Sequence, residues 1–245
     1  MLLCLLTTIM SCTSYKSLLS YNESPQIPSQ PQQITNYKPI TIQPNDILQI
    51  KVLSTDPIAA QPFNLSGGES GSGLGDYLVN SDGFIDFPTI GKIELKGLPI
   101  EGVKSKIAEL LSPYFEQTPI VQVRLTNFKI NVNGEVGRPG SFNVVNDRIS
   151  LIDAVTLAGD FTNYSSRDSI LIIREQDGLR TFGYVNFNSS DVFNSPYFYL
   201  QQNDVLYVRP DKTIVNSVRD PASRFLPWIS AAVSITALII TLTKF

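Results

Sequence analysis

Three aspartates, Asp46, Asp82 and Asp86, are the residues of the folded body whose type would suit general acid–base chemistry. Such carboxylates must converge across a cleft to act as a pair. Here they stand in turns and short strands, where aspartate serves local geometry, so the sequence argues against a carbohydrate-active enzyme. The chain has 245 residues and no histidine. This excludes Ser-His-Asp and Cys-His catalysis and histidine-ligated zinc.

Both cysteines, Cys4 and Cys12, fall in the first twelve residues, so the body has neither a disulfide nor a thiolate metal site. Ile9-Met10-Ser11-Cys12 ends an apolar run and resembles a bacterial lipobox, whose cysteine is acylated and becomes the mature N-terminus. We expect a signal peptide at 1–11 and lipid on Cys12, with an ordinary signal peptide as the alternative. No metal or cofactor is expected.

The overall composition indicates a folded chain that does not bind nucleic acid. Apolar residues make up 42% and charged residues 17%, which is typical of a chain with a buried core. Lys and Arg number 19 against 22 Asp and Glu, a formal net charge of −3, so no basic face is expected. Residues 12–39 are rich in Pro, Ser, Gln and Asn and are predicted to be a flexible, lipidated tether.

The first folded unit is predicted over residues 40–126. Apolar and polar residues alternate from Gln43 to Leu53 and again from Ile120 to Leu125, which predicts half-buried strands. Tyr77 to Pro88 reads as a hairpin with an Asp-Gly turn at Asp82 and Gly83. Pro99 opens a helix whose apolar residues recur at helical spacing up to Leu111.

The second unit is predicted over residues 127–210. The stretch Gly134 to Gly140 is a turn between strands, in which Gly137 and Gly140 are expected to adopt conformations that a Cβ would oppose. Ser150 is a helix N-cap with Asp153 as its capping-box acid, and Gly159 ends that helix. Several strands with one helix in each unit predict an α+β fold of two small mixed domains.

After a linker at 211–224, residues 225–245 are predicted to form a transmembrane helix. Phe225 to Thr243 contains no charge and is long enough to cross a bilayer. The flanking cations and an interfacial aromatic are Arg224, Lys244 and Trp228. One face of the helix carries a small, mildly polar stripe, formed by Ser230, Ser234, Ala237 and Thr241. The stripe either faces a water-filled lumen or packs against a neighbouring helix, so both interpretations require self-association.

Together, these motifs resemble the bacterial outer-membrane polysaccharide export family. The first unit is similar to its polysaccharide export domain through Asp46-Ile-Leu-Gln-Ile-Lys-Val52, Asp82-Gly83-Phe-Ile-Asp-Phe-Pro88-Thr-Ile-Gly91 and Pro119-Ile-Val-Gln-Val. The second resembles a soluble-ligand-binding β-grasp domain through Gly134-Glu-Val-Gly-Arg-Pro139-Gly140, Asp153 to Gly159 and Asn203-Asp204-Val-Leu-Tyr-Val. One departure is Leu98, where the family usually has Thr, so the first helix is expected to lack a side-chain cap.

The resemblance implies an outer-membrane lipoprotein with its body in the periplasm of a Gram-negative envelope. Copies would form a ring whose terminal helices cross the membrane, engage an inner-membrane polysaccharide copolymerase and export capsular polysaccharide or exopolysaccharide. A periplasmic saccharide-binding or adaptor lipoprotein that forms no pore remains the alternative. Deletion of the terminal helix distinguishes the two, because only a pore requires it.

Overall fold

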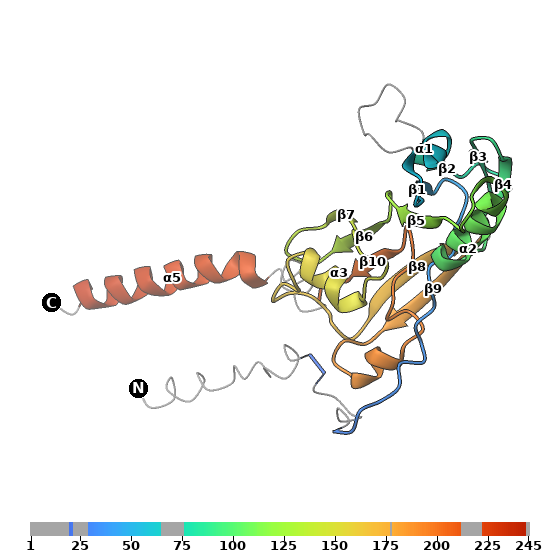
Figure 1. Ribbon diagram of the computed structural model, residues 1–245. Helices are drawn as coiled ribbons and strands as arrows, with labels where there is room; N and C mark the ends of the chain where they lie inside the picture. The colour runs from blue at the N-terminus through green and yellow to red at the C-terminus, as the bar shows by residue number, and fades with distance from the viewer. Residues whose placement is uncertain (1–19, 22–28, 65–75, 177, 212–221, 244–245) are drawn as a thin grey trace.

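The computed structural model of the chain describes residues 20–21, 29–64, 76–176, 178–211 and 222–243 (Figure 1). Within these residues helices and strands are mixed, and ten strands form three sheets. The predicted α+β class is therefore confirmed. A long helix follows the folded body at its C-terminal end.

The described residues of the first part of the body form nine elements. They are β1 (Ile47–Leu53), α1 (Pro57–Ala60), η3 (Gln61–Phe63), β2 (Asp76–Leu78), β3 (Phe84–Phe87), β4 (Gly91–Glu94), α2 (Ile100–Leu111), η4 (Ser112–Tyr114) and β5 (Ile120–Leu125). β1 lies between β2 and β5 in an antiparallel sheet. Because side chains alternate along a strand, Leu48, Ile50 and Val52 are buried on one face, in one cluster with the apolar stripe of α2.

The hairpin expected over Tyr77 to Pro88 is wrong in its pairing. The turn at residues 81–83 forms, but β2 pairs with β1, and β3 pairs with β4. The true hairpin therefore turns at residues 88–90, immediately before β4. Helix α2 begins at Ile100 with Pro99 as its N-cap and has no side-chain cap. The expected lack of a cap is confirmed, but the residue at the cap position is Pro99 and not Leu98.

In the second part of the body, the residues that the structure describes form seven elements. They are β6 (Lys129–Gly134), β7 (Gly140–Asn143), α3 (Leu151–Leu157), β8 (Ile170–Gln176), β9 (Leu179–Val185), η5 (Ser190–Asn194) and β10 (Val205–Val208). The sheet order is β7-β6-β10-β8-β9, in which β6–β7 and β8–β9 are antiparallel hairpins. The central strand β10 runs parallel to β6 and antiparallel to β8. Helix α3 connects the two hairpins, which is a β-grasp arrangement.

Each part of the body has its own buried apolar cluster. The first gathers the inward side chains of β1, β5 and α2, and the second gathers those of the five-stranded sheet and α3. Leu125 packs against both clusters, and Ile40 belongs to the second. The two clusters therefore meet where β5 leads into β6.

The described part of the predicted tether lies on the second domain. The Asn36 amide donates to the carbonyls of Phe193 and Ser195, each at 2.8 Å. The ring of Tyr37 packs edge-on against Tyr199, with centroids 5.1 Å apart. The chain therefore crosses the β-grasp domain before it enters the first domain.

Helix α5 (Ala222–Thr243) extends away from the folded body (Figure 1). Phe225–Leu242 is long and apolar enough to span a membrane, and none of it is buried against the rest of the protein. Pro227 lies within the helix, close to its N-terminal end. A helix of this kind exposes its apolar side chains on all sides and needs a lipid or protein environment.

Candidate functional site

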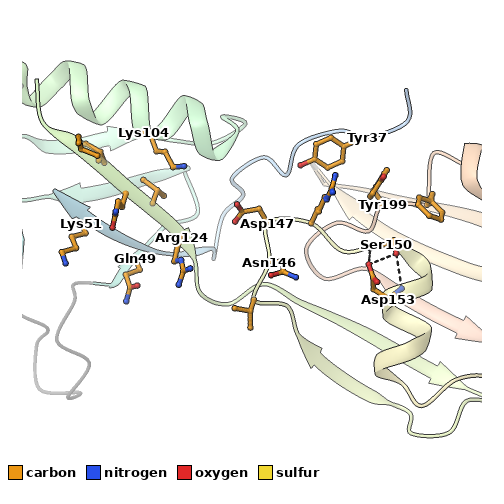
Figure 2. Close-up of a pocket in the computed structure, with 17 residues that line it drawn as sticks. Tyr37, Gln49, Lys51, Lys104, Arg124, Asn146, Asp147, Ser150, Asp153 and Tyr199 are labelled. Atoms are coloured by element: carbon orange, nitrogen blue, oxygen red, sulfur yellow. Dashed lines mark hydrogen bonds between the residues drawn. The ribbon is translucent and has the colours of Figure 1, made fainter. Parts of the chain in front are cut away.

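A cleft of about 1310 Å³ lies between the two domains. Figure 2 shows Gln49, Lys51 and Arg124 of the first domain on one side and Tyr37 and Tyr199 on the other. The segment that connects β7 to α3 passes between them. The cleft therefore depends on how the two domains are joined.

The outer face of the β1–β5 pair forms the floor of the cleft. In the antiparallel register, Gln49 lies opposite Arg124 and Lys51 lies opposite Gln122. These four side chains point away from the apolar cluster because the residues between them point into it. The same alternation that builds the core thus presents two cations and two amides to the cleft.

Strand β5 also presents its free edge to the cleft. Thr126 donates its N–H to the Ile47 carbonyl at 2.9 Å, and these two residues continue the β1–β5 register. Main-chain groups alternate in direction along an antiparallel pair, so those of Val121 and Val123 point away from β1. Within the part of the chain that the structure describes, no strand pairs with this edge. Among the described residues, these main-chain donors and acceptors therefore have no strand partner.

Aromatic and polar residues form the opposite wall. The Arg148 guanidinium lies over the Tyr37 ring, 5.9 Å from its centroid. Asp153 is held in the predicted capping box, in which its carboxylate accepts from the N–H and hydroxyl of Ser150 at 2.9 and 2.7 Å (Figure 2). The cleft is lined by two aspartates, Asp147 and Asp153. Asp153 is therefore engaged in holding the start of α3.

Two amide side chains fix the junction between the domains. Asn127 accepts from the Ile47 N–H at 2.9 Å and donates to the Asn45 carbonyl at 2.9 Å. From the other domain, Gln202 donates to the Asn127 carbonyl at 2.8 Å and accepts from the Lys129 N–H at 2.9 Å. The connecting residues are thus hydrogen-bonded to a turn in each domain.

Asp46 lies in the turn that precedes β1. Its carboxylate accepts from the Gln43 N–H at 2.9 Å, and Asn45 adopts a left-handed φ of 71°. Asp46 is only 2% exposed. Burial raises the pKa of its carboxyl to about 6, against the opposing effect of the Gln43 hydrogen bond.

Asp204 lies in a corresponding turn before β10 and is fully buried. It forms an ion pair with Arg174, with Nη2 at 2.7 Å, and accepts from the Gln201 N–H at 2.8 Å. Burial raises the pKa of Asp204, and the Arg174 guanidinium opposes that rise. The same guanidinium donates to the Tyr199 carbonyl at 3.0 Å, which links this ion pair to the wall of the cleft.

The structure does not bring the three candidate acid–base aspartates together in the cleft. Asp46 is enclosed in its turn, Asp82 is exposed in the turn before β3, and Asp86 is exposed on β3. None of the three lines the cleft. Of the local roles predicted for them, the structure shows that of Asp46, whose carboxylate is hydrogen-bonded within its turn.

Three family-motif residues shape the turns on either side of β3. Gly83 has a φ of +90°, and a Cβ there would lie 2.4 Å from Cβ of Lys96. Pro88 accepts from the Ile90 N–H at 2.7 Å, and Gly91 starts β4 with a φ of +88°. These residues allow the backbone conformation of the two turns, and none of them lines the cleft.

In the turn from Gly134 to Gly140, Gly137 requires glycine as expected, and Gly134 requires it as well. A Cβ on Gly134 would lie 2.0 Å from the Val208 carbonyl oxygen, and one on Gly137 would lie 2.5 Å from the Gly159 carbonyl oxygen. Gly140 has open space around it and no left-handed φ, so the expectation for Gly140 is wrong. The turn instead docks on the C-terminal end of α3, where Gly159 has a φ of +77°. Pro139 lies between these glycines and is exposed.

The hydroxyls of the helix stripe are satisfied within α5. Ser230 donates to the Pro227 carbonyl at 2.9 Å, Ser234 to the Ser230 carbonyl at 2.9 Å, and Thr241 to the Ala237 carbonyl at 3.0 Å. Such bonds let a hydroxyl face lipid or another helix without an orphaned donor. The hydroxyls of the stripe therefore do not need water as a hydrogen-bond partner.

Some predicted positions lie outside the residues or side chains that the structure describes. Cys12 and Lys244 are outside the described residues, and Arg224 is within α5 but its side chain is not described. Trp228 lies near the N-terminal end of α5 and is exposed. The assignments of lipid attachment and of the interfacial residues stay predictions.

Three important residues were missed from the sequence, namely Arg174, Asn127 and Gln202. Each acts on a partner far along the chain, so no local pattern marks it. The one available signal was the repeat of Gln-x-Asn-Asp at Gln43 and Gln201, which marks two turns of the same kind.

Residues 35–126 match the family model described as polysaccharide biosynthesis/export protein. The match runs from the segment that carries Tyr37 through β1 and α2 to the end of β5. It contains the motifs around Asp46, Asp82 and Gly91. The resemblance inferred from those motifs is confirmed for this domain.

Proposed function

We propose that this protein is an outer-membrane lipoprotein whose copies assemble into a polysaccharide-exporting ring. The premise is that residues 35–126 form a polysaccharide export domain. Lipid on Cys12 and helix α5 would hold both ends of the chain at the membrane, with the two domains in the periplasm. The family match carries this proposal. Its cargo would be capsular polysaccharide or exopolysaccharide.

Helix α5 supports the membrane part of the proposal. Its 22 residues correspond to about 33 Å of helix, close to the thickness of a bilayer core. Its described side chains are exposed apolar groups or hydroxyls bonded to the helix's own carbonyls. A ring of such helices would bury one face of each against its neighbours.

The proposed partners are other copies of the chain, an inner-membrane polysaccharide copolymerase and the polysaccharide itself. The two-domain body would meet the copolymerase from the periplasmic side. No catalytic step is assigned to the protein, because the candidate carboxylates Asp46, Asp82 and Asp86 do not line the cleft.

Deleting residues 225–245 tests the export function. The truncated lipoprotein should still be acylated and localised, but surface polysaccharide should be lost from a strain that depends on this protein. Immunoblotting of membrane fractions provides the control for localisation. Normal surface polysaccharide with the truncated protein would contradict the pore and favour the adaptor.

The adaptor remains a second candidate, and one observation favours it. The stripe hydroxyls are already bonded to α5 carbonyls, so the helix would be equally stable as a closely packed anchor without a lumen. An adaptor would need the lipid on Cys12 for its location. Cys12→Ala should therefore block lipoprotein processing under either candidate, and normal acyl labelling of that variant would refute lipidation at this residue.

A further inference from the structure

The floor of the interdomain cleft carries an uncompensated pair of cations. In the β1–β5 register, Lys51 and Arg124 are diagonal neighbours, so their Cβ atoms are about 7 Å apart. The residues that lie opposite these two cations are the neutral amides Gln49 and Gln122. Among the described residues, neither cation forms an ion pair. Two neighbouring like charges without a counter-charge favour the binding of an anion.

The remaining charges of the cleft keep its lining positive. Arg148 and Lys104 add two further cations, although Lys104 also pairs with Glu101 at 2.6 Å. The carboxylates are Asp147 and Asp153, and Asp153 is engaged in the capping box. Four cations therefore face two carboxylates in this cavity, although the whole chain carries a net charge of −3.

The uncharged groups of the cleft suit a polyhydroxylated chain. The free edge of β5 offers the N–H and carbonyl of Val121 and Val123, and Asn146 adds an amide from the segment that connects β7 to α3 (Figure 2). Tyr37, 36% exposed, presents an aromatic ring beside that of Tyr199. Hydroxyls would bond to the amides and main chain, while the apolar face of a sugar ring would lie against an aromatic side chain.

From these features we propose that the cleft binds an acidic segment of polysaccharide, whose carboxylates pair with Lys51 and Arg124. This inference rests on the proposed export function, which supplies the saccharide class. A volume of about 1310 Å³ is above the usual range for a small-molecule pocket, so the cleft has room for several sugar residues. The segment would lie along β5, between the two domains.

Calorimetric titration of the full-length lipoprotein in detergent tests the proposal with two probes, an oligogalacturonate and a malto-oligosaccharide of equal length. The acidic probe should bind, and its affinity should fall as salt is added; the neutral probe should bind much more weakly. The double variant Lys51→Gln/Arg124→Gln should weaken binding of the acidic probe about tenfold or more, because it removes two charge-assisted contacts.

The matched control is Lys92→Gln/Lys129→Gln, which changes net charge equally at exposed positions outside the cleft. The affinity of this control variant for the acidic probe should stay within about twofold of the wild-type affinity. Equal loss in both double variants, equal binding of the two probes, or no binding of either would overturn the inference. The salt dependence of the wild-type protein decides the matter even if a variant folds poorly.

A photo-crosslinking amino acid at Gln122 tests the occupant in cells. The proposal expects an adduct that polysaccharide-degrading enzymes shorten, whereas an adduct that only protease removes would show a protein strand on the β5 edge and overturn it. Failure of the export proposal is separate, because export is measured with the truncation of residues 225–245. Failed binding together with lost export on truncation would reject this site and leave the proposed function intact.

Discussion

Asp46 and Asp204 occupy the same place in two turns of the same construction, one before β1 and the other before β10. Each carboxylate accepts the N–H three residues earlier, that of Gln43 at 2.9 Å and that of Gln201 at 2.8 Å. The difference is the counter-charge: Arg174 forms an ion pair with Asp204, whereas Asp46 has no ion pair among the described residues. The two turns therefore present one geometry in two electrostatic environments.

Replacing Asp204 should be far more costly than replacing Asp46. Asp204→Asn leaves the Arg174 guanidinium, only 13% exposed, without its carboxylate. Breaking a buried ion pair from one side typically lowers the free energy of unfolding by about 3 kcal/mol or more. Urea denaturation should show this loss, with Asp46→Asn as the matched control because Asn keeps an acceptor for the Gln43 N–H. Equal stability of the two variants would contradict a structural role for the ion pair.

Asp46 also predicts a pH dependence of stability. Burial raises its pKa from 3.8 to about 6, so the folded state holds the proton more tightly than the unfolded chain. The stabilising contribution is complete below the unfolded pKa and is lost as pH rises through about 6. The free energy of unfolding should therefore fall between about pH 4 and pH 6 through this group.

Asp46→Asn isolates that contribution. The variant should lose the part of the pH slope that Asp46 supplies, so its stability relative to the wild type should increase from about pH 4 to about pH 7. Denaturant titrations at several pH values measure the difference. A difference that does not vary with pH would show that Asp46 titrates alike in the folded and unfolded chains.

Asn127 should couple the two domains. Asn127→Ala removes its side-chain bonds to the Ile47 N–H and the Asn45 carbonyl, which should cost about 1–2 kcal/mol. The carbonyl that accepts from Gln202 is main-chain and remains. Calorimetry should show the two domains unfolding at more widely separated temperatures. Thr126→Ala is a suitable control, because its hydroxyl makes one exposed bond, to the Ile47 carbonyl at the start of β1.

What the sequence revealed about the fold was local. The alternation of β1, the period of α2 and the capping box of Ser150 and Asp153 each depend on residues a few positions apart, and all three form. The partner of β2 and the Arg174–Asp204 pair depend on residues brought together from distant parts of the chain. Pattern alone does not specify such pairings.

The candidate site was predictable to the same limited extent. The sequence identified Asp46 and Asp204 as motif residues but not their partners. The cleft combines β1 and β5 with Tyr37, Arg148 and Tyr199, so it exists only once the two domains are docked. The positive charge of the cleft could not be predicted from the composition, because the whole chain has a net charge of −3.

Glycine requirements in the turn from 134 to 140 can be separated by three alanine variants. Gly137→Ala places a Cβ 2.5 Å from the Gly159 carbonyl oxygen, and Gly134→Ala places one 2.0 Å from the Val208 carbonyl oxygen. Each should lower the free energy of unfolding by about 2 kcal/mol or more, because backbone must move. Gly140→Ala meets nothing within 4 Å and should be close to neutral. A large loss at Gly140 alone would contradict this account.

Bulk on the stripe of α5 should impair export more than bulk beside it. Ser234→Leu widens the face formed with Ser230, Ala237 and Thr241, which would separate close-packed helices or narrow a lumen. Val233→Leu is the control, because it replaces one apolar side chain by another off the stripe. Surface polysaccharide should fall for Ser234→Leu and persist for Val233→Leu, with equal amounts of both proteins in the membrane. Equal export would show that the stripe makes no critical contact.

Water access along α5 distinguishes a lumen from a packed anchor. Because the stripe hydroxyls bond to helix carbonyls, packing alone explains them, and only solvent exposure would reveal a pore. Cysteines placed singly at 230, 234 and 241 should react with a membrane-impermeant thiol reagent if copies enclose a lumen, while those at 229, 233 and 240 should stay protected by lipid. Ser234→Lys sharpens the test, since a lysine is tolerated in water but costs about 3 kcal/mol at the centre of a bilayer. Protection at all six positions, with Ser234→Lys failing to insert, would exclude an open lumen and leave α5 as the packed anchor of an adaptor.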